Sequence, residues 1–119
     1  ELSNERTNVN IALGDFNVTS LEDADANLYG KFNKDWYISH LDQCKECKGT
    51  NYYYRDDRWS FLDAVMLKKK RNSKFIEDSV VVIRANIHTR ENGSPLRFNA
   101  RDLKGVSDHF PVVAVVEIN

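Results

Sequence analysis

The chain has 119 residues and a formal net charge of -1, with 41% apolar and 29% charged residues. This length predicts one domain at most, with a modest core. The charge argues against a strongly basic nucleic-acid module but leaves room for a local basic patch. No apolar run approaches the roughly 20 residues that a membrane-spanning helix needs, so we expect no transmembrane segment. The chain begins with Glu1 rather than Met, so we expect a mature product or a piece cut from something longer.

The first part of the chain alternates apolar runs with turn-forming residues. Residues 8–13, NVNIAL, predict a buried strand that ends at the following glycine. Residues 20–30 predict a short helix, because Ser20 can cap its start, acidic side chains follow in the first turn and Gly30 is a stop signal. Residues 33–44 fit either irregular structure or a short helix.

The second part is rich in β-branched and aromatic residues, which favour strands. Strands are predicted at residues 50–55, 59–67, 79–87 and 110–118. The first two are close enough in sequence to form a hairpin, and residues 105–109 predict a polar loop. The predicted fold class is therefore α/β (α+β), a mostly antiparallel sheet with one or two short flanking helices.

The two cysteines, Cys44 and Cys47, form a single C-x-x-C motif. A zinc site would need further ligands, and His40 offers only a third. A thioredoxin-like site would need the motif to open a helix, whereas Gly49 and an aromatic run follow it. A local disulfide and two unreactive thiols are the alternatives.

Polar residues gather at two predicted strand ends. Asp15 and Asn17 follow the first strand, and Ser107, Asp108 and His109 precede the last one. If these two strands pair antiparallel, both groups lie at the same edge of the sheet. Carboxylates are hard ligands for magnesium, manganese or calcium. A histidine beside a metal can protonate or stabilise a phosphoryl oxygen, and an asparagine can orient a water or an oxyanion.

Asp63 is a carboxylate inside an otherwise apolar run. Burying a carboxylate is costly unless it is paired, and its natural partner is a histidine that it holds in one tautomer. Each of these features also has a purely structural interpretation. Asp15 to Asn17 can form an Asx turn, residues 107–109 a polar loop, and Asp63 a structural contact. That interpretation predicts that Asp15 and His109 lie far apart.

Three segments in this order carry a resemblance to a known family. ALGDFN at 12–17, WSFLDAVML at 59–67 and GVSDHFPVVAVV at 105–116 resemble the C-terminal half of the endonuclease/exonuclease/phosphatase superfamily, which has the deoxyribonuclease I-like fold. The match spans residues 9–118. The resemblance implies a divalent-metal-dependent phosphoester hydrolase, with residues 1–119 forming the C-terminal portion of its domain.

The resemblance also implies roles for individual residues. Asp15 and Asn17 match residues that position the attacking water or nucleophile and hold the scissile phosphate. Asp63 matches the aspartate that orients the catalytic histidine. His109 matches that histidine, which contacts the phosphate and stabilises the transition state. Asp108 matches a metal-binding acid, and the expected cofactor is Mg²⁺, or Mn²⁺ or Ca²⁺ in its place.

The family's domain is longer than this chain and is a four-layer α/β sandwich of two sheets with outer helices. The resemblance therefore implies that this chain forms half of that sandwich. The other half, which carries a metal-binding glutamate, is missing, so we expect the chain to be inactive alone. The expected partners are this missing N-terminal half, a second copy that covers the exposed sheet face, and a phosphoester substrate.

Family membership does not choose the substrate, so nucleic acid, phospholipid and inositol phosphate stay open. The run KKKR at 68–71 could follow a phosphate backbone or be a solvated surface. The tyrosines at 52–54 could stack on bases or pack in the core. The alternative function is a non-catalytic binding or scaffold module that keeps the fold.

Overall fold

The computed structural model describes residues 8–44 and 47–119. Its helices are α2 (Ser20–Ala26), α3 (Leu28–Phe32), α4 (Ser39–Asp42) and the 3-10 helix η1 (Asn86–His88). Its strands are β1 (Ile11–Asp15), β2 (Trp36–Ile38), β3 (Asn51–Tyr53), β4 (Arg58–Ser60), β5 (Asp63–Lys68), β6 (Ser73–Phe75), β7 (Val81–Val82), β8 (Val112–Val113) and β9 (Val116–Ile118). The predicted class is confirmed: antiparallel strands dominate and the few helices are short.

The sheet that positions the site has the strand order β1-β5-β2, with both outer strands antiparallel to β5. Its register places Asp15 directly opposite Asp63 and Gly14 opposite Ala64. Residues directly opposite in an antiparallel pair point to the same face. The two aspartates therefore lie side by side where β1 ends and β5 begins.

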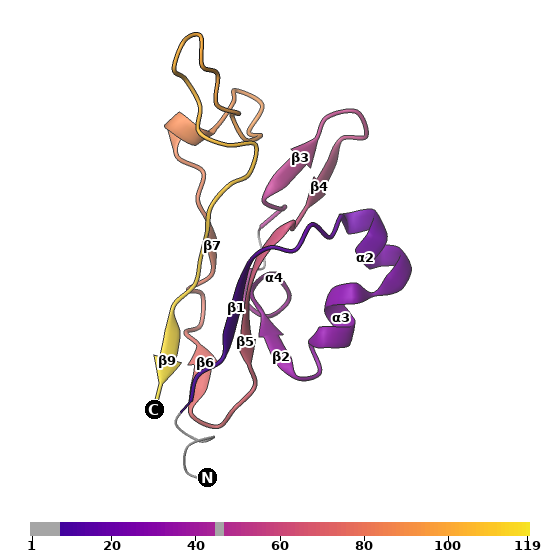
Figure 1. The fold of residues 1–119 in the computed structure, drawn as a ribbon, viewed down its shortest axis with the longest axis vertical. Helices are drawn as coiled ribbons and strands as arrows, with labels where there is room; N and C mark the ends of the chain where they lie inside the picture. The colour runs from indigo at the N-terminus through magenta and orange to yellow at the C-terminus, as the bar shows by residue number, and fades with distance from the viewer. Residues whose placement is uncertain (1–7, 45–46) are drawn as a thin grey trace.

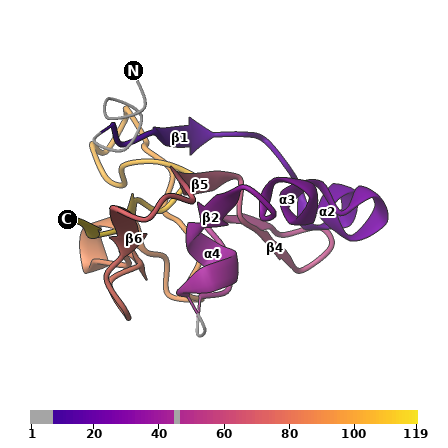
Figure 2. The ribbon, with the colours of Figure 1, turned by 90° about the horizontal axis from the view of Figure 1, so that it is seen from below.

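One face of this sheet packs against the helices. Tyr29, Ile38, Ala64 and Met66 are buried together there. In both views, α2 and α3 lie on the side of the molecule away from the C-terminus (Figures 1 and 2). This face is the main apolar core of the described chain.

The start of α2 differs by one residue from the sequence prediction. Thr19, not Ser20, is the N-cap, because its hydroxyl accepts from the Glu22 backbone while the Glu22 carboxylate accepts from Thr19. This reciprocal pair is a capping box. Gly30 lies inside α3 instead of ending a helix, since the break comes at the left-handed Asn27.

The first strand was predicted to be buried, and this prediction is wrong. Ile11 is 48% exposed and Leu13 is 70% exposed. Ala12 packs against the core on the helix side, so Ile11 and Leu13, which alternate with it, point to the opposite face of the sheet. An apolar pattern shows that a face is suited to burial, and it does not show what covers that face.

The later strands are shorter than the apolar runs that predict them. The hairpin of β3 and β4 forms as expected, while the run at 79–87 contributes only β7 and the run at 110–118 divides into β8 and β9. The Ser79 hydroxyl explains the division, because it bonds to both the N–H and the carbonyl of Val115. At this point in the ladder the N–H of Val115 thus bonds to a side-chain hydroxyl instead of a backbone carbonyl of a neighbouring strand.

The molecule is elongated, with extents of 55 × 32 × 23 Å. Its radius of gyration is 16.2 Å, whereas a compact domain of this length has about 13.5 Å. The segment between β7 and β8 extends at the end of the long axis opposite the termini (Figure 1). None of the helices among the described residues has the length and apolar character that crossing a bilayer requires.

Candidate functional site

Three of the predicted site residues meet at one point. The ligand-type atoms of Asp15, Asp63 and His109 all lie within 4.8 Å of one another. Asp15 comes from the end of β1, Asp63 from the start of β5, and His109 from the loop before β8. The prediction that Asp15 and His109 lie far apart, which follows from the structural interpretation, is therefore wrong. We call these three residues the Asp-Asp-His cluster.

His109 and Asp63 form a direct pair. The Nδ1 atom of His109 is 2.7 Å from the Oδ2 atom of Asp63, and each side chain is 23% exposed. An ionised carboxylate can only accept a hydrogen bond, so Nδ1 carries the proton and donates it. This fixes the tautomer of the ring and leaves Nε2 available for a ligand.

The route by which His109 reaches the cluster differs from the predicted one. The strand before the cluster, β1, pairs with β5 and not with the final strand. His109 instead forms an antiparallel bridge with Asn51 at the start of β3. The side-chain amide of Asn51 also donates to the backbone carbonyl of Asp108 at 3.0 Å. Residues of the β3 hairpin thus hold the histidine in place.

Thr50 joins the two halves of the pair. It is fully buried, its hydroxyl accepts from the N–H of Asp63 at 3.3 Å, and its carbonyl accepts from the N–H of Phe110 at 2.8 Å. The neighbouring Gly49 has no room for a side chain, because a Cβ atom would lie 2.7 Å from the Ser60 carbonyl oxygen. Sequence reasoning missed Thr50, since a lone threonine at the start of a strand carries no distinctive signal.

Asp15 and Asn17 form the Asx turn that the structural interpretation predicts. The N–H of Asn17 donates to Oδ1 of Asp15 at 2.8 Å, and Asn17 has a φ of 55°. Asparagine tolerates this left-handed conformation better than most residues. The N–H groups of Phe16 and Asn17 both donate to the carbonyl of Leu62. The turn therefore fixes the Asp15 carboxylate beside Asp63.

Asp108 lies next to the cluster in sequence but its carboxylate is not part of it. Its side chain is exposed, and its contact with the rest of the site is through its backbone. Within residues 8–44 and 47–119, the carboxylates brought together where a divalent cation could bind are Asp15 and Asp63. Two carboxylates fit Mg²⁺, which keeps several waters and takes further oxygens from a phosphate substrate.

The rings of Tyr29, His40 and Phe61 pack together as an aromatic group. The Tyr29 hydroxyl donates to the Phe61 carbonyl at 2.8 Å, and burial, with the nearby carboxylates of Asp23, Asp63 and Asp15, raises the pKa of Tyr29 to about 12. Tyr29 therefore stays neutral over the physiological pH range.

His40 belongs to this aromatic group. In the part of the chain that the structure describes, it is not in a cluster of metal-ligating side chains. Its ring stacks on Phe61 and meets Tyr29 edge-on, with 4.4 Å between centroids in both cases. Burial lowers the pKa of His40 to about 4. Cys44 and Cys47 form a disulfide, so the motif offers no thiolate for a metal.

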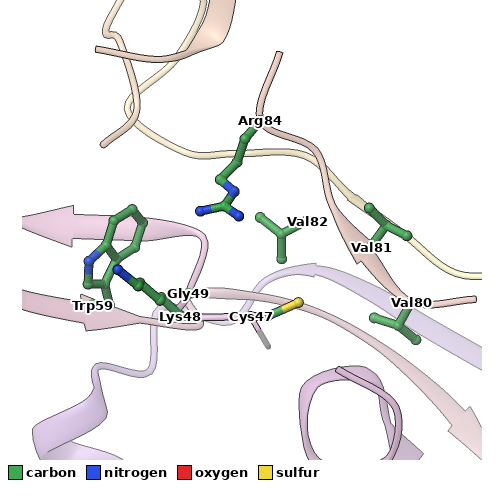
Figure 3. Close-up of a pocket in the computed structure, with 8 residues that line it drawn as sticks. All are labelled: Cys47, Lys48, Gly49, Trp59, Val80, Val81, Val82 and Arg84. Carbon is green, nitrogen blue, oxygen red and sulfur yellow. The ribbon is translucent and has the colours of Figure 1, made fainter. Parts of the chain in front are cut away.

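Two cavities lie outside the cluster. One, of about 170 Å³, is lined by the cations Lys48 and Arg84, by Trp59 and by the valines of β7 (Figure 3). The other, of about 350 Å³, is apolar and lies between β1 and the helices α2 and α3. Neither is lined by Asp15, Asp63 or His109.

The basic run at 68–71 lies at the far end of β5 from Asp63. Lys68 lies over the Trp36 ring and Lys69 over the Tyr37 ring, while Lys70 bonds to the side chain of Asn10. These contacts are with the chain itself. They place the run away from the cluster, and they favour its interpretation as a surface feature.

Of the three tyrosines at 52–54, the first two lie in β3 and Tyr54 lies in the turn that follows. Tyr52 is half-buried against Trp59, with ring centroids 5.2 Å apart, whereas Tyr53 and Tyr54 are 45% and 70% exposed. The exposed pair leaves base stacking open as a prediction.

Comparison of the chain with protein-family models, with curated proteins and with solved structures finds no match in any of the three. The functional assignment therefore depends on the geometry of the site and on the resemblance of its three motifs.

Proposed function

We propose that this chain carries the C-terminal half of the active site of a divalent-metal-dependent phosphoester hydrolase of the endonuclease/exonuclease/phosphatase type. The observation that carries the proposal is the pairing of His109 with Asp63 beside Asp15, from three segments far apart in the chain. A structural turn explains Asp15 alone, but it gives no reason for a carboxylate-held imidazole next to it. The order of the three motifs in the sequence supports the same proposal.

The residues have distinct roles in this proposal. Asp15 aligns the attacking water and accepts its proton, and the turn with Asn17 keeps that carboxylate in place. Asn17 binds an oxygen of the phosphoryl group, and the Nε2 atom of His109, in the doubly protonated ring, donates to the oxygen where negative charge develops in the transition state. Asp63 accepts from the Nδ1–H and stabilises this imidazolium.

The cation would be held by carboxylates at the sheet edge. The geometry favours Asp15 and Asp63 for this role. The resemblance names Asp108 instead. When bound, Mg²⁺, or Mn²⁺ or Ca²⁺ in its place, supplies charge stabilisation at the phosphoryl oxygens.

The exposed face of β1 fits a half-domain. Ile11 and Leu13 lie on an edge strand and are 48% and 70% exposed, which is unusual for large aliphatic side chains of a predicted core strand. In this proposal the N-terminal half of the sandwich, or a second copy of the chain, covers them.

The test is a hydrolysis assay of the protein that contains this chain, with Mg²⁺ or Mn²⁺ and with a chelator blank. The panel is plasmid DNA, RNA, sphingomyelin and inositol phosphates. We expect metal-dependent hydrolysis of one class, reduced about 10²- to 10⁴-fold in His109→Ala. Lys34→Gln is the control, because it removes an exposed side chain that lies outside the cluster and outside residues 84–106. Hydrolysis that His109→Ala leaves intact would overturn the proposal, and no turnover on the whole panel would favour the binding module.

A further inference from the structure

Residues 84–106 form a projection that we call the arm. It leaves the body after β7 and returns just before Ser107 (Figure 1). Of its side chains only Ser94 and Pro95 are buried, so the arm has almost no apolar core of its own. A segment of this length that buries so little must owe its shape to hydrogen bonds.

Backbone hydrogen bonds and Asx turns give the arm a defined shape. The N–H of Leu96 donates to the His88 carbonyl at 2.6 Å, and that of Val106 donates to the Leu96 carbonyl at 3.0 Å. The side chain of Asn99 accepts from the N–H of Arg101 at 3.0 Å. Gly105 has a φ of 78°, and a Cβ there would lie 2.2 Å from the Arg97 carbonyl oxygen. These contacts fix the backbone from which the cations of the arm project.

The arm is basic although the chain is not. It carries five cations and two acids, a net charge of +3, whereas the whole chain has -1. The cations are Arg84, Arg90, Arg97, Arg101 and Lys104, and all of them are exposed. None forms an ion pair with a carboxylate in the described ranges 8–44 and 47–119. Unpaired cations on one projection produce a local positive potential.

The arm leads directly into the cluster. Its last residue is three positions before His109, and its base is closed by the N–H of Ile83, which donates to the Pro111 carbonyl at 2.9 Å. A ligand with many phosphates in a row can therefore contact the arm and the cluster together, whereas a single phosphate group cannot span both.

We propose that the arm binds the phosphate backbone of a nucleic acid and brings it to the cluster. This deepens the proposed function, and only the delivery to His109 rests on it. Four of the five cations are arginines, whose planar fork binds phosphate in a bidentate manner. Phe98, 51% exposed among them, offers a ring on which an unpaired base can stack. The near-neutral charge of the whole chain conceals this basic surface.

The test measures binding of a fluorescein-labelled single-stranded 20-mer to the full chain by anisotropy, in EDTA so that hydrolysis plays no part. The triple substitution Arg90→Gln, Arg97→Gln and Arg101→Gln is expected to weaken binding at least about tenfold and to lower the salt slope by about 2. The matched control removes three exposed cations elsewhere: Lys31→Gln, Lys34→Gln and Arg71→Gln. We expect the control to stay within about twofold of the native chain.

A charge-retaining triple, with lysine at the same three positions, keeps the salt slope if charge is what matters, and circular dichroism checks that each variant is folded. The inference is overturned if the native chain does not bind, or if the arm triple and the control weaken binding equally. It is also overturned if the arm triple releases the chain from phosphatidylserine vesicles while its oligonucleotide binding stays unchanged.

Failure of this inference and failure of the proposed function give different results. If the arm binds the oligonucleotide but the complete protein hydrolyses nothing, the inference about the arm stands and the proposed hydrolase function fails. If the complete protein hydrolyses another phosphoester with a metal and shows no arm-dependent binding, the hydrolase function stands and the inference about the arm fails.

Discussion

His109 and Asp63 are 46 residues apart in the chain, and their side chains meet at 2.7 Å. The contact joins the start of β5 to the loop before β8. Removing the carboxylate while keeping its shape isolates its effect on the imidazole. We expect Asp63→Asn to leave the fold largely intact, because the side chain lies partly in water, and to lower activity of the complete protein by about 10²- to 10⁴-fold.

The tautomer provides a second readout for Asp63→Asn. Nitrogen chemical shifts of the His109 ring should show a proton on Nδ1 in the native chain and a mixture in the variant. Full activity in Asp63→Asn would contradict the assigned role.

Thr50 should matter more for the site than its ordinary residue type suggests. Thr50→Val keeps the shape but leaves the Asp63 N–H without its acceptor. A buried donor without a partner costs about 1–3 kcal/mol, so the free energy of unfolding should fall by that amount in urea titrations. Thr50→Ser retains the hydroxyl and should retain the ring signals of His109. Equal effects of serine and valine would show that packing, and not the hydrogen bond, is what counts.

His40 should make the fold sensitive to acid. Burial lowers its pKa to about 4 from the ordinary 6.5. Between these values the unfolded chain binds the proton and the folded chain does not, so stability falls as pH drops from 6.5 toward 4. The loss should amount to about 2–3 kcal/mol, measured by urea unfolding across that range.

His40→Phe keeps the stacking on Phe61 and cannot titrate, so it should flatten this pH dependence. A variant as acid-sensitive as the native chain would assign the effect to other groups.

Leu13 tests what covers the edge strand. The side chain is 70% exposed, so Leu13→Lys should change the free energy of unfolding of the chain by no more than about 0.5 kcal/mol. If the apolar face is covered by a second copy, the variant should sediment as a monomer where the native chain associates. Leu103→Lys, at a similarly exposed position on the arm, is the control. Identical sedimentation of the native chain and Leu13→Lys at high concentration would argue against self-association through this face.

The sequence predicted the polar ends of the site better than the path between them. Asp63 stands out because it interrupts an apolar run, and a buried carboxylate needs a partner, so a histidine near a strand end was a reasonable expectation. The predicted pairing of the first strand with the last was wrong. The first strand, β1, pairs with β5, and His109 is held by Asn51. Pairing between strands is non-local, and alternation along one strand does not identify its neighbour.

The extent of the later strands was also beyond local pattern. Residues 79–87 read as one strand because five of them are Val or Ile, yet the hydroxyl of Ser79 takes the backbone of Val115 and η1 begins at Asn86. The exposure of Leu13 depends on what lies against β1, which no local pattern contains. The arm was missed for a similar reason, because its cations are scattered in sequence and gather only when the segment folds back on itself.

The wide separation of the cluster residues has a consequence for how the site forms. Asp15 and Asp63 come together when β1 pairs with the central strand, and His109 joins only after the chain has closed the long loop that includes the arm. Loops of this length close slowly, because the free-energy cost of closing them is offset only when the last contacts form. The pair of His109 and Asp63 should therefore be among the last native contacts made during refolding, so an imidazole signal from His109 can serve as a clock for completion of the fold.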